Sequence, residues 1–172
     1  YYEQTLKLSN YVIIMAPTII IASVVTFFYG RVYDKFGFTK SVVPVITLLL
    51  LGYVLLYFFT NTILVFIGSI FMLSGYLSGM AVFGAMIRDN TPQNKTGMFQ
   101  GIRIIAQVLI PGVIGPAIGA LVLKNAEKIP NGDGTESFIP NHNIYLAAFI
   151  AGLFIFLSIW GVSWLKKKNS TN

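Results

Sequence analysis

The sequence contains no cysteine and only one histidine, His142. Without cysteine the chain can form neither a disulfide nor a thiolate metal site, and a single histidine supplies too few ligands for a zinc centre. No cluster of histidine and acidic residues marks an enzyme active site. We therefore predict no catalytic residue, no metal and no cofactor, and a protein that is not an enzyme.

Charged residues are also scarce. Lysine, arginine, aspartate and glutamate together make up 10% of the 172 residues, whereas 55% of the residues are hydrophobic. A soluble domain carries about a quarter charged residues. So few charges do not cover the surface of a soluble fold, and the composition therefore predicts an integral membrane protein.

Five apolar runs occupy most of the chain, and each is long enough to cross a hydrocarbon core of about 30 Å as a helix. The predicted fold is an all-α membrane protein, a bundle of five transmembrane helices. The predicted spans are residues 11–29, 42–59, 63–87, 98–123 and 144–165. In the third span, Gly75 and Gly79 stand four residues apart, which predicts close packing against a neighbouring helix.

The basic residues are distributed unevenly between the two sides that five spans define. Three of them lie on one side, Lys7, Lys124 and Lys128, and nine lie on the other, Arg31, Lys35, Lys40, Arg88, Lys95, Arg103, Lys166, Lys167 and Lys168. Cytoplasmic loops carry the excess of lysine and arginine. Loops 30–41 and 88–97 and the C-terminus are therefore predicted to be cytoplasmic, and loop 124–142 external. The net charge of +6 then reflects topology, and we predict no nucleic-acid partner.

The first polar segment, residues 30–41, concentrates charge between two apolar runs. Gly30 and Gly37 bracket a short chain reversal, where glycine permits a positive φ or a close approach of helices. Asp34 follows Arg31 by three residues and precedes Lys35, a spacing that allows local ion pairs. Such contacts can break when helices slide, so we predict a conformational latch. The alternative is an ordinary turn whose charges serve topology alone.

This segment resembles the loop signature of the major facilitator superfamily, Gly-x-x-x-Asp-Arg/Lys-x-Gly followed by two basic residues. Phe38 and Thr39 occupy the usual basic positions. The matching residues are Gly30, Asp34, Lys35, Gly37 and, slightly late, Lys40. In that family the loop joins the second and third helices of a six-helix half. The resemblance therefore implies five helices of one half, with a helix missing upstream of Tyr1.

The second polar segment, residues 88–97, fits the same resemblance. Its Asp-x-x-Pro pattern, followed by a basic residue and glycine, looks like the cytoplasmic loop between the fourth and fifth helices of a half. Asp89 can neutralise Arg88, and Arg103 in the next helix can reach back towards Asp89 or Asp34. We include Arg88, Asp89 and Arg103 in the predicted latch, with topology charges as the alternative.

Proline and glycine interrupt the fourth run, and broken helices are the best sequence pointer to a transporter's binding site. The predicted helix break comprises Pro111, Gly115, Pro116 and Gly119. One turn earlier, the amide of Gln107 lies within an apolar run, where a polar group is costly unless paired. Gln107, Tyr76 and Thr18 are therefore candidate substrate contacts, with a structural interhelical bond as the alternative for Gln107. No carboxylate lies within a run, so either a coupling proton or sodium ion binds elsewhere or transport is not coupled to a cation.

The resemblance leaves the half and the substrate open. The pattern Gly115-Pro116-x-x-Gly119 is similar to an antiporter signature of N-terminal halves, whereas the polar chain end and the lack of an arginine in the third run favour the C-terminal half. The pattern from Ile87 to Arg103 resembles bacterial sugar carriers, including glycoside–cation symporters. The resemblance thus implies secondary active transport of a sugar or related solute by alternating access, together with the missing half, in a bacterial inner membrane. A drug–proton antiporter and a non-transport structural subunit of the membrane are the alternatives.

Overall fold

The computed structural model of the protein describes the backbone of residues 1–169 and the side chains of residues 1–161. The predicted cytoplasmic lysines at 166–168 therefore have side chains outside the described part. The elements in chain order are α1 (Tyr11–Phe58), α2 (Thr62–Asp89), the 3-10 turn η1 (Gln93–Lys95), α3 (Thr96–Ile104), the π-helical turn η2 (Ile105–Leu109), α4 (Ile110–Val122), β1 (Lys128–Pro130), β2 (Glu136–Phe138) and α5 (Asn143–Asn169).

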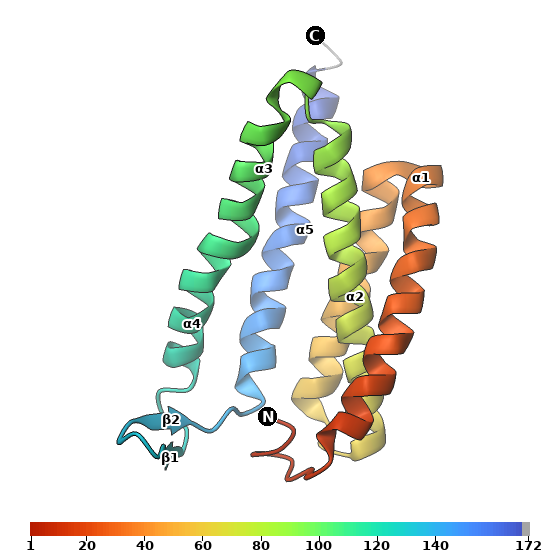
Figure 1. The fold of residues 1–172 in the computed structure, drawn as a ribbon. Coiled ribbons are helices and arrows are strands. Elements are labelled where there is room, and N and C mark those ends of the chain that lie inside the picture. The colour runs from red at the N-terminus through yellow and green to blue at the C-terminus, as the bar shows by residue number, and fades with distance from the viewer. Residues whose placement is uncertain (170–172) are drawn as a thin grey trace.

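Four helices of the described chain are long and apolar enough to cross a membrane: α1, α2, the continuous helix from η1 to α4, and α5. The longest, α1, reverses direction at Gly37 and forms two arms, residues 11–36 and 38–58, so the chain passes along the bundle five times (Figure 1). The N-terminus and the end of α5 lie at opposite ends of the bundle (Figure 1). A helix satisfies its own backbone polar groups, as lipid requires. The structure confirms the predicted all-α membrane fold.

The reversal within α1 is much shorter than the predicted loop 30–41. Only Gly37 leaves the helical conformation, with φ of 73° and ψ of −178°. In the second polar segment, α2 likewise continues to Asp89 and α3 begins at Thr96. A hydropathy pattern detects the residue at which an apolar run gives way to charged residues. A charged side chain on the surface does not end a helix. The helices therefore extend into both segments.

The helices α1 and α2 pack closely through small residues. A Cβ atom added to Gly52 would lie 2.3 Å from the backbone nitrogen of Met72, and one added to Gly75 would lie 2.4 Å from the backbone nitrogen of Leu49. At both positions the main chains approach so closely that no side chain fits between them. The close packing predicted for Gly75 is therefore present, and it is α1 that approaches.

The hydrophobic core lies between the second arm of α1, α2 and α5. Its largest cluster of buried residues is Tyr33, Val42, Val45, Ile46, Leu50 and Val82. The side chains of α5 that pack on this cluster include Phe149, Ile155, Phe156 and Ile159. By contrast, none of the residues of α3, η2 and α4 is buried. This helix therefore stands at the edge of the bundle with its apolar side chains uncovered.

Residues 124–142, predicted as a polar loop, contain a small antiparallel hairpin of β1 and β2 at the end of the bundle that carries the N-terminus (Figure 1). The Lys128 ammonium lies 2.9 Å from the Glu136 carboxylate across the strands. In the turn, the Asp133 carboxylate accepts hydrogen bonds from the Thr135 hydroxyl and backbone N–H, which lower the pKa of Asp133. The turn chemistry of this segment thus builds an ordered connection.

Candidate functional site

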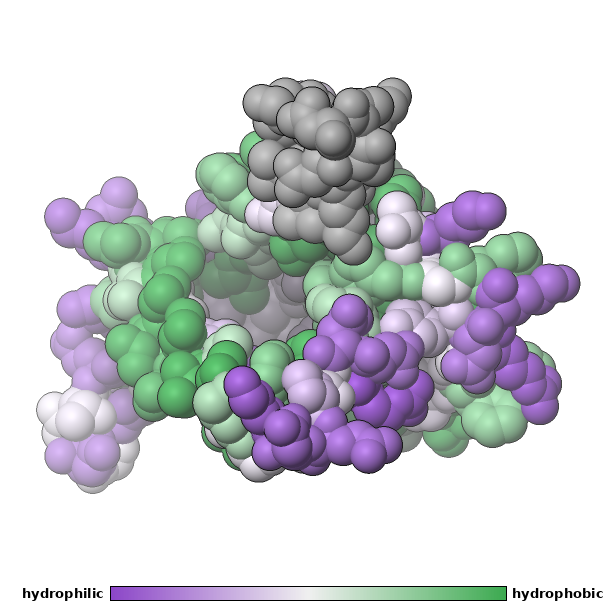
Figure 2. Space-filling model, turned by 90° about the horizontal axis from the view of Figure 1, so that it is seen from above, coloured by the Kyte–Doolittle hydropathy of each residue, from purple (hydrophilic) through white to green (hydrophobic). Residues whose placement is uncertain are grey.

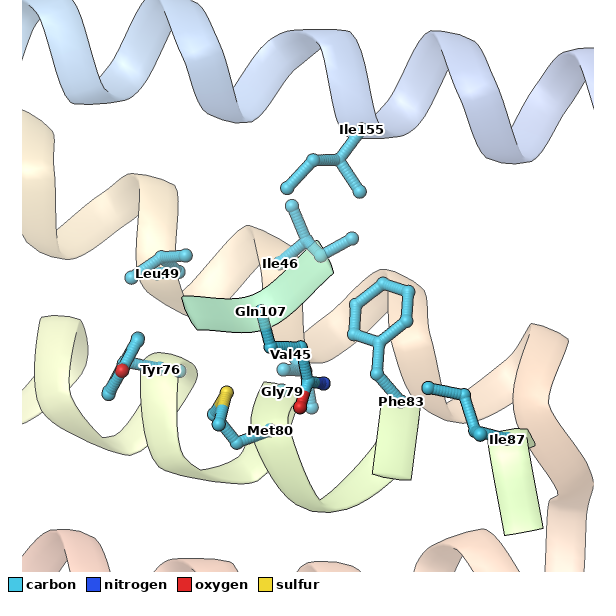
Figure 3. Close-up of a pocket in the computed structure, with 11 residues that line it drawn as sticks. Val45, Ile46, Leu49, Tyr76, Gly79, Met80, Phe83, Ile87, Gln107 and Ile155 are labelled. Atoms are coloured by element: carbon cyan, nitrogen blue, oxygen red, sulfur yellow. The ribbon is translucent and has the colours of Figure 1, made fainter. Parts of the chain in front are cut away.

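A pocket of about 360 Å³ lies between α2, the second arm of α1 and η2, with Ile155 of α5 at its border (Figure 3). Most of its lining is apolar, including Ile46 and Phe83. Two lining side chains carry hydrogen-bonding groups, Tyr76 and Gln107. An apolar pocket with a few convergent polar groups is the usual form of a small-molecule site.

Two of the three predicted substrate contacts therefore meet in one pocket, although they come from distant parts of the chain. Tyr76 is about half exposed, and Figure 3 shows Gln107 extending from its helix towards α2. The third candidate, Thr18, does not line this pocket. It is fully buried in the first arm of α1, where its hydroxyl donates to the backbone oxygen of Ile14 at 2.6 Å. Its hydroxyl is therefore hydrogen-bonded within its own helix.

A π-helical turn positions Gln107. The turn η2 contains Gln107 and directly precedes α4, in which Pro111 occupies the first turn. Proline has no N–H to donate to the carbonyl four residues earlier, which belongs to Gln107, and its ring crowds that carbonyl. A widened turn accommodates both effects, and such turns are frequent at functional sites. The chain therefore remains helical across the residues predicted to break it, Pro111, Gly115, Pro116 and Gly119.

Arg103 lies beside this pocket rather than in the predicted latch. Its Nε donates to Oε1 of Gln107 at 2.9 Å. Its Nη2 faces α2, at 3.3 Å from the point that a Cβ atom on Gly84 would occupy. The expected reach towards Asp89 or Asp34 is not formed, because Arg103 sits one helical turn before Gln107 and points across to α2. Among the described residues Arg103 has no carboxylate within salt-bridge distance.

The two polar segments are joined by a contact that the sequence did not indicate. The hydroxyl of Tyr33 donates to Oδ2 of Asp89 at 2.8 Å, and Oδ1 of Asp89 forms an ion pair with Arg88 at 3.2 Å. Tyr33 is buried in the core and connects the α1 turn to the end of α2. The available signal was a tyrosine directly before Asp34, but its partner depends on how α1 and α2 pack.

The remaining residues of the predicted latch lie around this contact without joining it. The guanidinium of Arg31 lies over the rings of Phe27 and Phe28, and the ammonium of Lys35 lies over the ring of Phe36. Asp34 forms no ion pair within the described part of the chain and instead borders a small pocket with Gly30, Tyr33 and Arg88. Lys40 is exposed in the second arm of α1. The predicted pairing of Asp34 with Arg31 or Lys35 is therefore not formed.

Removing the Tyr33 hydroxyl should loosen this end of the bundle. In Tyr33→Phe, Asp89 loses a hydrogen bond worth about 1 kcal/mol. The equilibrium between contact and separation of the α1 turn and the end of α2 should therefore shift roughly fivefold towards separation. Ala85 lines the small pocket together with Tyr33. Because the chain has no cysteine, the substitution Ala85→Cys introduces a single thiol whose exposure reports the separation of α1 from α2. The measurement is the rate of maleimide modification of that thiol in membranes.

Tyr29→Phe is the matched control for this prediction. Tyr29 lines the same small pocket, and among the described residues its hydroxyl forms no hydrogen bond, so its removal should leave the modification rate unchanged. Equal rates in Tyr33→Phe and the unmodified chain would show that the Tyr33–Asp89 bond does not hold this end closed.

Viewed from the end that carries the α1 turn, the surface is hollowed at its centre (Figure 2). Hydrophobic residues border the hollow on one side, and hydrophilic residues gather on the other (Figure 2). Polar side chains therefore gather at this end of the bundle, where the α1 turn lies. This is the distribution expected where helices leave a membrane.

The comparisons with known proteins agree with this architecture. The family model of the Major Facilitator Superfamily matches residues 2–172, which is nearly the whole chain. No curated protein and no solved structure matches the chain. Members of this family carry solutes across membranes and are not enzymes. With four helices able to span a membrane, one of them folded into two arms, and a family match along its length, the chain belongs to the major facilitator superfamily.

Proposed function

We propose that the chain is part of a secondary active transporter that moves a small organic solute by alternating access. The pocket beside Gln107 carries this proposal. It lies along the C-terminal half of α2, between α2, which has buried residues, and η2, which has none. The second half of the transporter would cover the exposed face of α3 and α4. Rocking of one half against the other would then expose the pocket to either side in turn.

The lining of the pocket supports a solute with an extended apolar surface and one or two hydrogen-bonding groups. Tyr76 and Gln107 supply a hydroxyl and an amide, whereas the neighbouring Met80 and Phe83 offer only apolar contact. A sugar presents many hydroxyl groups, and each would lose its hydrogen bonds to water on entering such a pocket. This observation favours a drug-like organic solute over the sugar that the sequence suggested.

The proposal also covers the coupling ion and the orientation of the chain in the membrane. No acidic residue lines the pocket, so a coupling proton or sodium ion would bind in the second half. The excess of basic residues at the two polar segments supports a cytoplasmic position for these segments and for the C-terminus. We assign the chain to the C-terminal half of a bacterial inner-membrane transporter. The Tyr33–Asp89–Arg88 contact would then hold the cytoplasmic end closed.

The proposal is tested by counterflow in proteoliposomes that contain the full-length protein. The solutes compared are a labelled disaccharide and labelled aromatic amphiphiles that carry a carboxylate or a quaternary ammonium group. Counterflow of an amphiphile without the disaccharide supports the proposed solute class. Counterflow of the disaccharide alone would overturn that class, and no counterflow of any solute by a folded protein would overturn the transport proposal for these solutes.

Gln107→Leu should raise the KM of transport roughly tenfold, because a buried hydrogen bond to the solute is lost while its apolar contacts remain. The measurement is the concentration dependence of counterflow, with membrane expression followed in parallel. Gln100→Leu makes the same chemical change at an exposed position of α3 outside the pocket and should leave KM unchanged. An unchanged KM in Gln107→Leu would assign Gln107 a purely structural role.

A further inference from the structure

Arg103 is a cation held beside the pocket by one of the residues that line it. Its Nε is fixed by the 2.9 Å hydrogen bond to Gln107, a residue that lines the pocket. Its terminal Nη2 reaches α2 at Gly84, between the lining residues Phe83 and Ile87. The absence of a side chain at Gly84 leaves room for the guanidinium. The group therefore spans the space between α3 and α2 at the end of the pocket nearest the polar segments.

The charge of Arg103 is not balanced by the described residues. Asp89, a few residues beyond Gly84 on α2, already accepts from Tyr33 with one oxygen and pairs with Arg88 through the other. Asp34 borders a different pocket, which it lines together with Ala81 and Arg88 of α2. A cation placed against apolar side chains without a counter-charge is costly, and charged residues of membrane-spanning helices mark substrate pathways.

We propose that Arg103 binds the carboxylate of an amphiphilic organic anion whose apolar body occupies the adjoining pocket. This inference rests on the proposed transport function and names its substrate class. The Nε–H is used by Gln107, so the two terminal nitrogens remain to donate. A planar guanidinium presents such donors to a carboxylate in a paired geometry, and charge-assisted bonds of this kind are about twice as strong as neutral ones.

Gln107 then acts on the anion partly through Arg103. Its amide oxygen accepts from Arg103 and so orients the guanidinium, while its NH₂ group stays available to the solute. Lysine offers a point charge without the planar fork. Arg103→Lys should therefore keep part of the preference for an anion, whereas Arg103→Gln should abolish it.

The test uses three probes with one apolar body: 4-phenylbutyrate, 4-phenylbutanol and 4-phenylbutylamine. Their binding to the full-length protein in nanodiscs is measured by titration calorimetry, with empty nanodiscs as the blank for partition into lipid. The carboxylate should bind roughly ten- to a hundredfold more tightly than the alcohol, and the amine should bind most weakly. In Arg103→Gln the carboxylate and the alcohol should bind alike.

Lys95→Gln is the matched control, because it removes an exposed cation from η1, outside the pocket, and should leave the preference intact. Circular dichroism of each variant shows whether it is folded, and Arg103→Lys provides a second reading if Arg103→Gln is not. Equal binding of carboxylate and alcohol by the unmodified protein would overturn the anion inference while the apolar pocket stood. If none of the three probes bound although other solutes were transported, the inference would be wrong and the transport function would remain.

Discussion

Gly75→Ala is expected to lower the free energy of unfolding by about 1–3 kcal/mol, although it adds a single methyl group. The added Cβ would lie 2.4 Å from the backbone nitrogen of Leu49 and 2.6 Å from its Cα. Backbone atoms have no rotamer through which to withdraw, so α1 and α2 must separate along their contact. Their separation would also disturb the pocket, because Leu49 and Gly75 both line it.

Gly79→Ala is the matched control. Gly79 lies one turn further along α2 on the same face, but there a Cβ atom would meet only Cγ1 of Val45, at the ordinary contact distance of 3.4 Å. This variant should be close to neutral, or slightly more stable because alanine favours helix. Urea-dependent unfolding of both variants in detergent micelles measures the difference. Equal stability of the two variants would show that the close approach at Gly75 is not required.

Gly37→Ala is expected to destabilise the turn of α1 by about 1–3 kcal/mol, because its φ of 73° with ψ of −178° lies in a region that is essentially restricted to glycine. Space is not the cause, since no atom lies within 4 Å of the point that an added Cβ would occupy. The strain would instead act on the angle between the two arms, and so on the Tyr33–Asp89 contact beside the turn.

Gly30→Ala separates backbone strain from the addition of a methyl group. Gly30 lies in the same helix, also has no atom within 4 Å of an added Cβ, and has a helical backbone. Alanine is favoured over glycine there by up to about 1 kcal/mol, so this variant should be neutral or stabilised. Thermal unfolding followed by circular dichroism measures both. A Gly37→Ala protein as stable as Gly30→Ala would exclude strain at the turn.

Much of the fold was predictable because its causes are local. Apolar runs of sufficient length indicate helical passes, and the spacing of Gly30, Asp34, Lys35 and Gly37 indicates the family. The helix ends were less predictable. The first polar segment is helical except at Gly37, since hydropathy detects the edge of the apolar run but not the single residue at which the backbone turns. The fourth run similarly stays helical, because one π-helical turn absorbs the effect of Pro111.

The candidate site was predictable only in part. Gln107 and Tyr76 were identified as polar groups in apolar surroundings, and both line the pocket. Thr18 has the same chemistry but uses its hydroxyl within its own helix. The sequence placed Arg103 with the charges of the polar segments, whereas the structure joins it to Gln107. Its partner depends on which face of the fourth helical pass turns towards α2, and no local pattern specifies that rotation.

The sequence by itself determined the class of the protein and the number of its passes. A chain so apolar and so poor in charge must satisfy its backbone within helices, and this requirement acts on each run separately. Only the tertiary structure decided which charged groups meet. Tyr33 joins Arg88 in contacting Asp89, and Arg103 bonds to Gln107 instead of a carboxylate. These pairings depend on where α1, α2 and α3 approach one another. The points of approach are set jointly by residues that lie far apart in the chain.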